Sequence, residues 1–127
     1  MNFTTNKEKG NAALGMAIAY FAANGYIVSI PLNDTQDYDL IVDRNDRMER
    51  IQVKSSGCKT KYGITQVALK SCGGTKGKTY KTVVDTNIDK IFIVNELGEM
   101  YLLPKSEIKN RCTLNLNENL DIYKVKI

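Results

Sequence analysis

The chain has 127 residues and a formal net charge of +4, which is the size of one compact domain with an apolar core of its own. Apolar residues make up 43% and charged residues 25%, so an intrinsically disordered chain is excluded. Histidine is absent, which excludes Ser-His and Cys-His nucleophilic catalysis and every His-ligated metal site.

Two further features of the composition concern the cellular compartment. The N-terminus is polar and the apolar stretches are too short to cross a bilayer, so we expect a cytoplasmic protein without a membrane partner. The cysteines Cys58, Cys72 and Cys112 are odd in number and widely spaced, which predicts free thiols and argues against a disulfide framework or a zinc ribbon.

The N-terminal part of the chain predicts a helix followed by a short strand. Thr5 and Glu8 have capping-box spacing, and apolar residues recur at helical intervals up to Asn24-Gly25, so we expect a helix over residues 6–24. The β-branched segment Tyr26 to Ile30 predicts a strand packed beneath that helix.

The next two segments predict a β-hairpin. Tyr38 to Asp43 and Met48 to Ser55 alternate with period two on either side of Asn45-Asp46, a pair that favours a two-residue turn. If Arg44 pairs with Arg47 across that turn, the register of the whole hairpin follows from it.

The remaining segments carry shorter patterns, and together with the first elements they predict a single domain over residues 1–127. We expect a strand over Ile64 to Lys70, a loop over Ser71 to Tyr80, a short helical turn within Thr82 to Asp89, a hairpin of Ile91 to Val94 with Met100 to Leu103 that ends at Pro104, a brief helix over Lys105 to Arg111 and an edge strand over Asp121 to Lys126. The sum is an α/β fold bordering on α+β, with the N-terminal helix packed on a mixed, mostly antiparallel sheet.

Charge is distributed unevenly along the chain. Arg50 to Val84 holds eight cations and no acid, so the rest of the chain carries 4 − 8 = −4. Basic residues interleaved with glycine and tyrosine suit an arm that lays ammonium groups along phosphates. The lysines that we expect to contact DNA are Lys59, Lys61, Lys70, Lys76, Lys78 and Lys81. The alternatives are a solvated lysine surface and a binding site for an acidic protein partner.

The hairpin register predicts a polar cluster. With Arg44 opposite Arg47, Asp39 lies opposite Gln52, and Lys54 lies diagonally from Asp39 with about 7 Å between Cβ atoms. The opposite face is apolar and is expected to be core; it carries Tyr38, Leu40, Val42, Ile51 and Val53. A carboxylate, an amide oxygen and an ammonium group therefore converge on the face that we expect to meet water.

These residue types suit a magnesium site. Mg²⁺ prefers hard oxygen ligands, and the Asp39 carboxylate, the Gln52 side-chain oxygen and the Val53 main-chain carbonyl could supply them. A bound Mg²⁺ or Mn²⁺ lowers the pKa of a coordinated water and offsets charge on an attacked phosphate. Lys54 would orient the water or stabilise the developing charge. The predicted catalytic residues are Asp39, Gln52 and Lys54, and a site with one carboxylate predicts a need for millimolar metal.

The same residues resemble a known family. Asp39 followed by Gln52-Val53-Lys54, on a hairpin after a helix that begins at Lys9-Gly10-Asn11, is similar to the PD-(D/E)xK restriction-like nuclease superfamily. The stretch from Ser29-Ile30-Pro31-Leu32 through Lys54 resembles the branch that holds group I intron homing endonucleases and, more distantly, Holliday junction resolvases. The similarity runs from about residue 7 to about residue 108. It implies a restriction-endonuclease-like core, Mg-dependent cleavage of DNA, and assembly into homodimers or homotetramers.

The sequence departs from the family pattern at two positions. Gln52 stands where most members carry Glu or Asp, although the homing-endonuclease branch is similar in using Gln there. Active relatives such as the resolvases carry a metal-site glutamate on the first helix, and the aligned residue here is Leu14, which cannot ligate magnesium. Glu8 is a poor replacement because its spacing explains it as a cap, whereas Asp37 or Asp34 could donate a second carboxylate.

Two functions therefore remain open from the sequence. The first is a metal-dependent deoxyribonuclease, homing-endonuclease-like or resolvase-like, that acts on double-stranded or branched DNA. The second is a non-catalytic DNA-binding module on a degenerate nuclease fold, which Leu14 favours.

Overall fold

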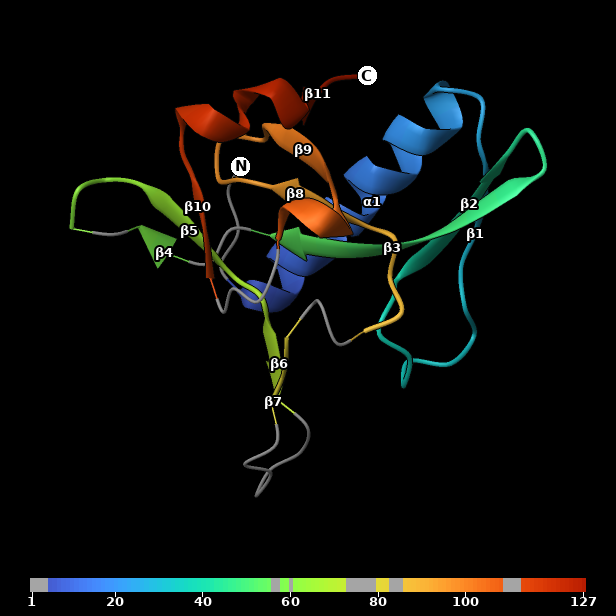
Figure 1. Cartoon of the computed structure of the whole chain (residues 1–127), viewed down its shortest axis with the longest axis horizontal. Coiled ribbons are helices and arrows are strands. Elements are labelled where there is room, and N and C mark those ends of the chain that lie inside the picture. Colours follow the sequence, from blue (N-terminus) through green and yellow to red (C-terminus); the bar gives the residue numbers. More distant parts are fainter. Residues whose placement is uncertain (1–4, 56–57, 60, 73–79, 83–85, 109–112) are drawn as a thin grey trace.

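The computed structural model describes residues 5–55, 58–59, 61–72, 80–82, 86–108 and 113–127 and places a helix against a six-stranded sheet (Figure 1). In chain order the elements are α1 (Asn6–Ala23), β1 (Ile27–Ser29), β2 (Leu40–Arg44), β3 (Arg47–Ser55), β4 (Cys58–Lys59), β5 (Thr65–Ala68), β6 (Lys70–Cys72), β7 (Tyr80–Thr82), β8 (Lys90–Val94), β9 (Met100–Pro104), the 3-10 helix η2 (Lys105–Glu107), β10 (Thr113–Leu116), the 3-10 helix η3 (Glu118–Tyr123) and β11 (Lys124–Val125).

The main sheet is mixed and mostly antiparallel, as the sequence predicts. Its strand order is β1-β2-β3-β8-β9-β11, and every neighbouring pair is antiparallel except β3 with β8. A parallel pair needs a long crossover connection. Here the crossover is the lysine-rich part of the chain, and it carries β5 of the small sheet β10-β5-β4 and the separate β6–β7 pair, which projects from the body of the molecule in Figure 1.

Helix α1 begins and ends where the sequence predicts. The Thr5 hydroxyl oxygen accepts a hydrogen bond from the Glu8 backbone N–H at 3.1 Å, and the chain leaves the helix at Asn24 and Gly25, whose φ of 84° favours glycine. Within the described ranges, no helix is long and apolar enough to cross a membrane.

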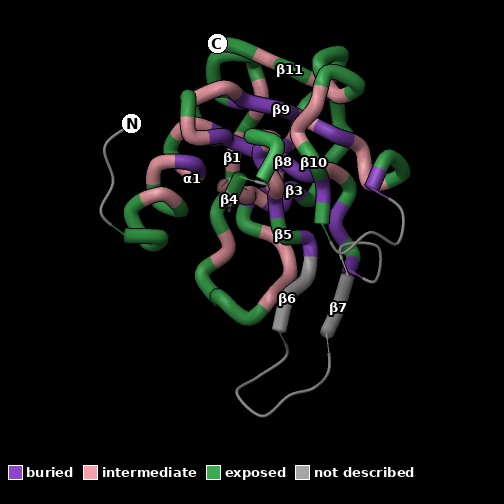
Figure 2. The backbone as a smooth tube through the Cα atoms, turned by 90° about the vertical axis from the view of Figure 1, so that its left-hand side faces the viewer, coloured by how far each residue is buried: buried purple, intermediate pink, exposed green. Residues whose placement is uncertain are grey.

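The sheet is covered on both faces, so it has two apolar cores. On one face, Ala13, Ala17 and Phe21 of α1 pack on residues of β2, β3 and β8 that include Leu40 and Phe92. The core on the other face joins the small sheet to β8 and β9; its buried residues are Val67, Leu69, Ile88, Ile91, Ile93, Tyr101, Leu103, Ile108 and Leu114. The buried residues of β8 and β9, purple in Figure 2, lie in the sheet between α1 on one face and the small sheet on the other.

The β2–β3 hairpin has the predicted register. Arg44 pairs with Arg47 and Leu40 pairs with Ile51, and the two residues of the turn, Asn45 and Asp46, have φ angles of 54° and 61°. Two positive φ angles in a two-residue loop define a type I′ turn, whose twist matches that of the flanking strands.

Tyr38 was predicted on the same core face as Leu40, and this prediction is wrong. Tyr38 packs against the core formed by the small sheet, and the Arg50 guanidinium lies over its ring at 5.6 Å from the ring centre. The reason is that β2 begins only at Leu40, so the alternation of strand residues does not extend back to Tyr38.

Several predicted boundaries also differ from the structure. The loop expected over Ser71 to Tyr80 begins and ends in paired strand residues, because β6 and β7 pair there; residues 73–79 lie outside the described residues. The edge strand expected over Asp121 to Lys126 is shorter in the structure. Only β11 is a strand there, because the preceding residues belong to the 3-10 helix η3. The turn within Thr82 to Asp89 and the helix over Lys105 to Arg111 lie partly outside the described residues, and η2 forms the first turn of the latter.

Candidate active site

The candidate site lies at the open end of the β2–β3 hairpin, where β3 continues past the start of β2. Asp39 directly precedes β2, and its backbone N–H donates to the Ile51 carbonyl at 2.9 Å. Its carboxylate accepts a hydrogen bond from the Val53 backbone N–H at 2.7 Å. The carboxylate thus accepts the hydrogen bond that a backbone carbonyl of a neighbouring strand would otherwise accept. This bond holds the Asp39 carboxylate against the edge of β3.

Gln52 is buried, with 9% of its surface exposed, although the sequence predicts that its face meets water. The prediction was wrong because Gln52 pairs with Ile91 of β8, and the small sheet covers that face. The Gln52 side-chain N–H donates to the Asp37 carbonyl at 3.1 Å. Among the described residues, its side-chain oxygen has no hydrogen-bond partner, which is a costly state for a buried acceptor.

Lys54 lies two residues beyond Gln52 on the same face of β3 and is partly buried. Its positive charge acts on Asp39: loss of solvation raises the pKa of the Asp39 carboxyl, while the Val53 hydrogen bond and the Lys54 ammonium group oppose that rise in pKa. Gln52 and Lys54 therefore share one face of β3, and the Asp39 carboxylate lies at the edge of that strand, where the Lys54 charge acts on it. The catalytic roles of these three residues stay predictions.

The oxygen atoms available to a metal ion come from three residues. Because Val53 directs its backbone N–H at Asp39, its carbonyl points toward the same edge of β3. The Asp39 carboxylate, the unpaired Gln52 oxygen and the Val53 carbonyl are all hard donors of the kind that Mg²⁺ prefers. Within the part of the chain that the structure describes, no group of three His, Cys, Asp or Glu residues could hold a metal ion, so the other oxygens at this site would have to come from amide groups or the backbone.

Leu14 of α1 occupies the position at which the sequence comparison above expects a metal-site glutamate. Leu14 is partly buried and packs against the core beneath α1. Asp37 takes part through its backbone, since its carbonyl holds the Gln52 amide. We did not anticipate this role, although the hairpin register, which puts Asp37 near Gln52, is a signal for it.

The lysines that the sequence proposes for DNA contact have four different placements. Lys59 is 59% exposed and forms an ion pair with Glu96 at 3.2 Å. The Lys61 ammonium group lies over the ring of the neighbouring Tyr62 at 5.1 Å. Lys70 and Lys81 belong to β6 and β7, and Lys76 and Lys78 lie outside the described residues.

Comparison with known proteins identifies the family and a similar fold. Residues 4–122 match the family model described as PD-(D/E)XK endonuclease. The fold is similar to the solved structure of a bacterial homing endonuclease, I-Ssp6803I, with a TM-score of 0.78 and 26% sequence identity over 91% of this chain and 80% of that chain. No curated protein sequence gives a significant match. Since the family model spans nearly the whole chain, this protein belongs to the PD-(D/E)XK endonuclease family.

Proposed function

We propose that this nuclease is a metal-dependent DNA endonuclease that hydrolyses phosphodiester bonds at the site formed by Asp39, Gln52 and Lys54. The observation that supports the proposal best is the buried Gln52 oxygen, which has no partner among the described residues, while the next residue of the strand, Val53, holds the Asp39 carboxylate. A bound cation is the partner that would satisfy both groups at once.

Each residue has a distinct role in this proposal. Asp39, Gln52 and the Val53 carbonyl would hold Mg²⁺ or Mn²⁺, which lowers the pKa of bound water and neutralises phosphate charge. Val53 fixes the Asp39 carboxylate through its N–H, and Asp37 fixes the Gln52 amide, so both oxygens are oriented before a ligand arrives. Lys54 would orient the attacking water or stabilise charge on the phosphate. One carboxylate implies weak binding and hence millimolar metal.

The substrate that we propose is double-stranded or branched DNA, cleaved in a homing-endonuclease-like or resolvase-like manner. The solved structure with the similar fold is that of a homing endonuclease, which supports a DNA substrate here. Cutting both strands of a duplex needs two sites related by a two-fold axis, so we propose a homodimer or homotetramer.

A non-catalytic DNA-binding module is the second candidate. The observation that favours it is Leu14, an apolar residue packed on the core of α1 where resolvases carry a metal-site glutamate. Such a protein would bind DNA and leave it uncut.

A plasmid-nicking assay separates the two candidates. We expect wild-type protein to nick supercoiled DNA in Mg²⁺ or Mn²⁺ and EDTA to stop it. Asp39→Asn and Lys54→Met should each lower the rate by a factor of about 100 or more, because each removes a charge that stabilises the reacting phosphate.

Matched variants control for general effects of charge. Glu118→Gln changes an exposed acid at the start of η3, and Lys126→Met changes an exposed lysine near the C-terminus. Both should nick DNA at the wild-type rate. DNA binding without metal-dependent nicking would instead establish the non-catalytic module, and nicking that survives Asp39→Asn would exclude the proposed site.

A further inference from the structure

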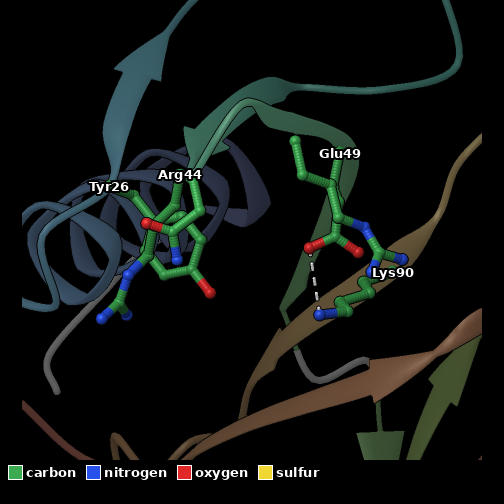
Figure 3. Close-up of a pocket in the computed structure, with 6 residues that line it drawn as sticks. Tyr26, Arg44, Glu49 and Lys90 are labelled. Atoms are coloured by element: carbon green, nitrogen blue, oxygen red, sulfur yellow. Dashed lines mark hydrogen bonds and ion pairs between the residues drawn. The ribbon is translucent and has the colours of Figure 1, made fainter.

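A second charged site lies at the turn end of the β2–β3 hairpin, away from Asp39. It is a hollow of about 360 Å³ between the hairpin, the segment that follows α1 and the start of β8 (Figure 3). Its lining consists of Tyr26, Arg44, Asn45, Arg47, Glu49 and Lys90. Three of these side chains are cations and one is an acid, so the lining carries a formal charge of +2.

The two arginines carry most of this uncompensated charge. Arg44 and Arg47 pair directly across the turn, where like charges repel each other. Glu49 does not relieve them, because it forms an ion pair with Lys90 at 3.1 Å, drawn as the dashed line in Figure 3. The nearby acids Asp43 and Asp46 do not line the hollow. An anion between the two guanidinium groups would remove this repulsion.

Arg44 is already held in position for such an anion. One of its N–H groups donates to the Asn24 carbonyl at 3.1 Å, and the guanidinium carbon lies 5.4 Å from the centre of the Tyr26 ring. Figure 3 shows Arg44 and Tyr26 together on one side of the hollow and the Glu49–Lys90 pair on the other. A guanidinium group has five N–H donors, so four remain available, and little side-chain entropy is lost when they bind a ligand.

The chemistry of the lining selects a phosphate group. Planar guanidinium forks match two phosphate oxygens at once, and the Lys90 ammonium adds charge without a fixed direction. We propose that this hollow binds a backbone phosphodiester of the DNA, distant from the bond that is cut. The inference rests on the proposed function, because it assumes that DNA is the substrate.

The hairpin itself sets the spacing between the two sites. Asp39 and Arg44 are five residues apart along extended chain, which corresponds to about 17 Å. The two sites nevertheless face opposite sides of the sheet. Glu49 and Lys90 pair with Val42 and Ile51, which pack under α1, whereas Gln52 and Lys54 lie on the other face. A DNA molecule that contacts both sites therefore has to pass around the hairpin rather than run along one face of it.

Binding measurements on charge-removing variants test the inference. The probe is a random-sequence duplex of about 30 base pairs in EDTA, so that no cleavage occurs. We expect Arg44→Gln and Arg47→Gln each to weaken binding about tenfold and to lower the slope of log affinity against log salt by about 1. Lys126→Gln removes an exposed cation outside the hollow and should change the affinity less than twofold.

A variant that is expected to strengthen DNA binding controls for general damage to the fold. Glu49→Gln removes the acid of the hollow and frees Lys90, so it should tighten binding about threefold and increase the salt slope. General damage to the fold would weaken binding in all three variants and so could not mimic this pattern. Arg44→Gln also removes the Asn24 contact, whereas Arg47 is exposed, so Arg47→Gln tests the site with the fold intact.

Each outcome has a definite meaning. Wild-type affinity and salt slope in both arginine variants would overturn the inference, while loss of nicking in Asp39→Asn would still support the proposed nuclease. A protein that binds no DNA would overturn both. Inorganic phosphate at millimolar concentration should compete with DNA only weakly; a melting temperature that inorganic phosphate raises in wild type and not in Arg47→Gln, without any effect of Arg47→Gln on DNA binding, would assign the hollow to a free phosphate.

Discussion

At the scale of single residues, the unsatisfied side-chain oxygen of Gln52 is the best indication of a ligand. Its oxygen is buried without a partner among the described residues, while its amide nitrogen is held by the Asp37 carbonyl. A buried acceptor without a hydrogen bond costs about 1–3 kcal/mol, so a folded protein keeps one mainly where a ligand or an ion completes it. The neighbouring Asp39 carboxylate makes a cation the natural partner.

Replacing the Gln52 amide by a carboxylate tests this view without DNA. Gln52→Glu adds a second negative oxygen beside Asp39, so we expect the metal-free variant to melt at a lower temperature than wild type, because two carboxylates then share a partly desolvated site. Mg²⁺ should reverse the loss and bind about tenfold more tightly than to wild type, since affinity follows ligand charge. Thermal unfolding across a Mg²⁺ titration measures both effects.

The control for this variant is Gln66→Glu on β5, where the side chain bonds to Asn115 away from the site. It should show the same Mg²⁺ response as wild type. If the melting temperature of Gln52→Glu ignored Mg²⁺ up to tens of millimolar, the Gln52 oxygen would not be a metal ligand. At ten times its dissociation constant, a bound ion adds about 1.4 kcal/mol to the free energy of unfolding, which a melting curve resolves.

At the scale of the element, the β2–β3 hairpin carries the candidate active site at one end and the arginine hollow at the other. A shift of one residue in its register would move Gln52 and Lys54 to the opposite face of the sheet. The type I′ turn at Asn45 and Asp46 therefore does more than connect two strands, because it sets which residues meet.

The turn can be tested by its requirement for positive φ. Asn45→Ala places a residue with a Cβ and no compensating side chain at a φ of 54°, so we expect a loss of about 1 kcal/mol in the free energy of unfolding. Asp46→Gly should be neutral or stabilising, because glycine favours this position of the turn. Urea denaturation measures both.

Asn33→Ala is the matched control, since Asn33 is exposed outside the hairpin, and it should change stability by less than about 0.5 kcal/mol. Equal stability of Asn45→Ala and wild type would mean that the turn does not hold the register. In that case the strand contacts alone would have to position Asp39 against Val53.

At the scale of the whole molecule, the decisive feature is that both faces of the main sheet are covered. Phe92 and Ile93 are neighbours on β8 and point to opposite faces, and both are fully buried, one in each core. The small sheet that covers the second face belongs in part to the crossover between β3 and β8. The connection that carries the lysines proposed for DNA contact therefore also covers the face on which Gln52 lies.

Adjacent substitutions on β8 test for two cores. Phe92→Ala should cost about 3–5 kcal/mol and Ile93→Ala about 2–5 kcal/mol in the free energy of unfolding, because each leaves a cavity in a separate core. Ile122→Ala should be nearly neutral, since Ile122 is 80% exposed. A sheet with one open face would tolerate one of the two β8 substitutions, and that result in chemical denaturation would contradict the two-core arrangement.

Local pattern was sufficient to predict α1, the two hairpins and the register of the β2–β3 hairpin. Leu40 and Ile51, the last pair of the hairpin before the candidate site, are related by a single turn, so turn chemistry and strand alternation determine their register. The family resemblance rests on Asp39 and on Gln52-Val53-Lys54 of this hairpin, and the family match confirms it. The strand β4 escaped prediction because it has only two residues, and β10 escaped prediction because it is short and pairs with β5, far earlier in the chain.

The sequence by itself thus determined which residues stand side by side on the hairpin, because a turn and a period of two act over a few residues. Only the tertiary structure decided that Gln52 is buried and that Arg44 meets Tyr26 and Asn24. Alternation assigns residues to a face of a strand, whereas segments far away in the chain decide whether that face is covered by protein or by water.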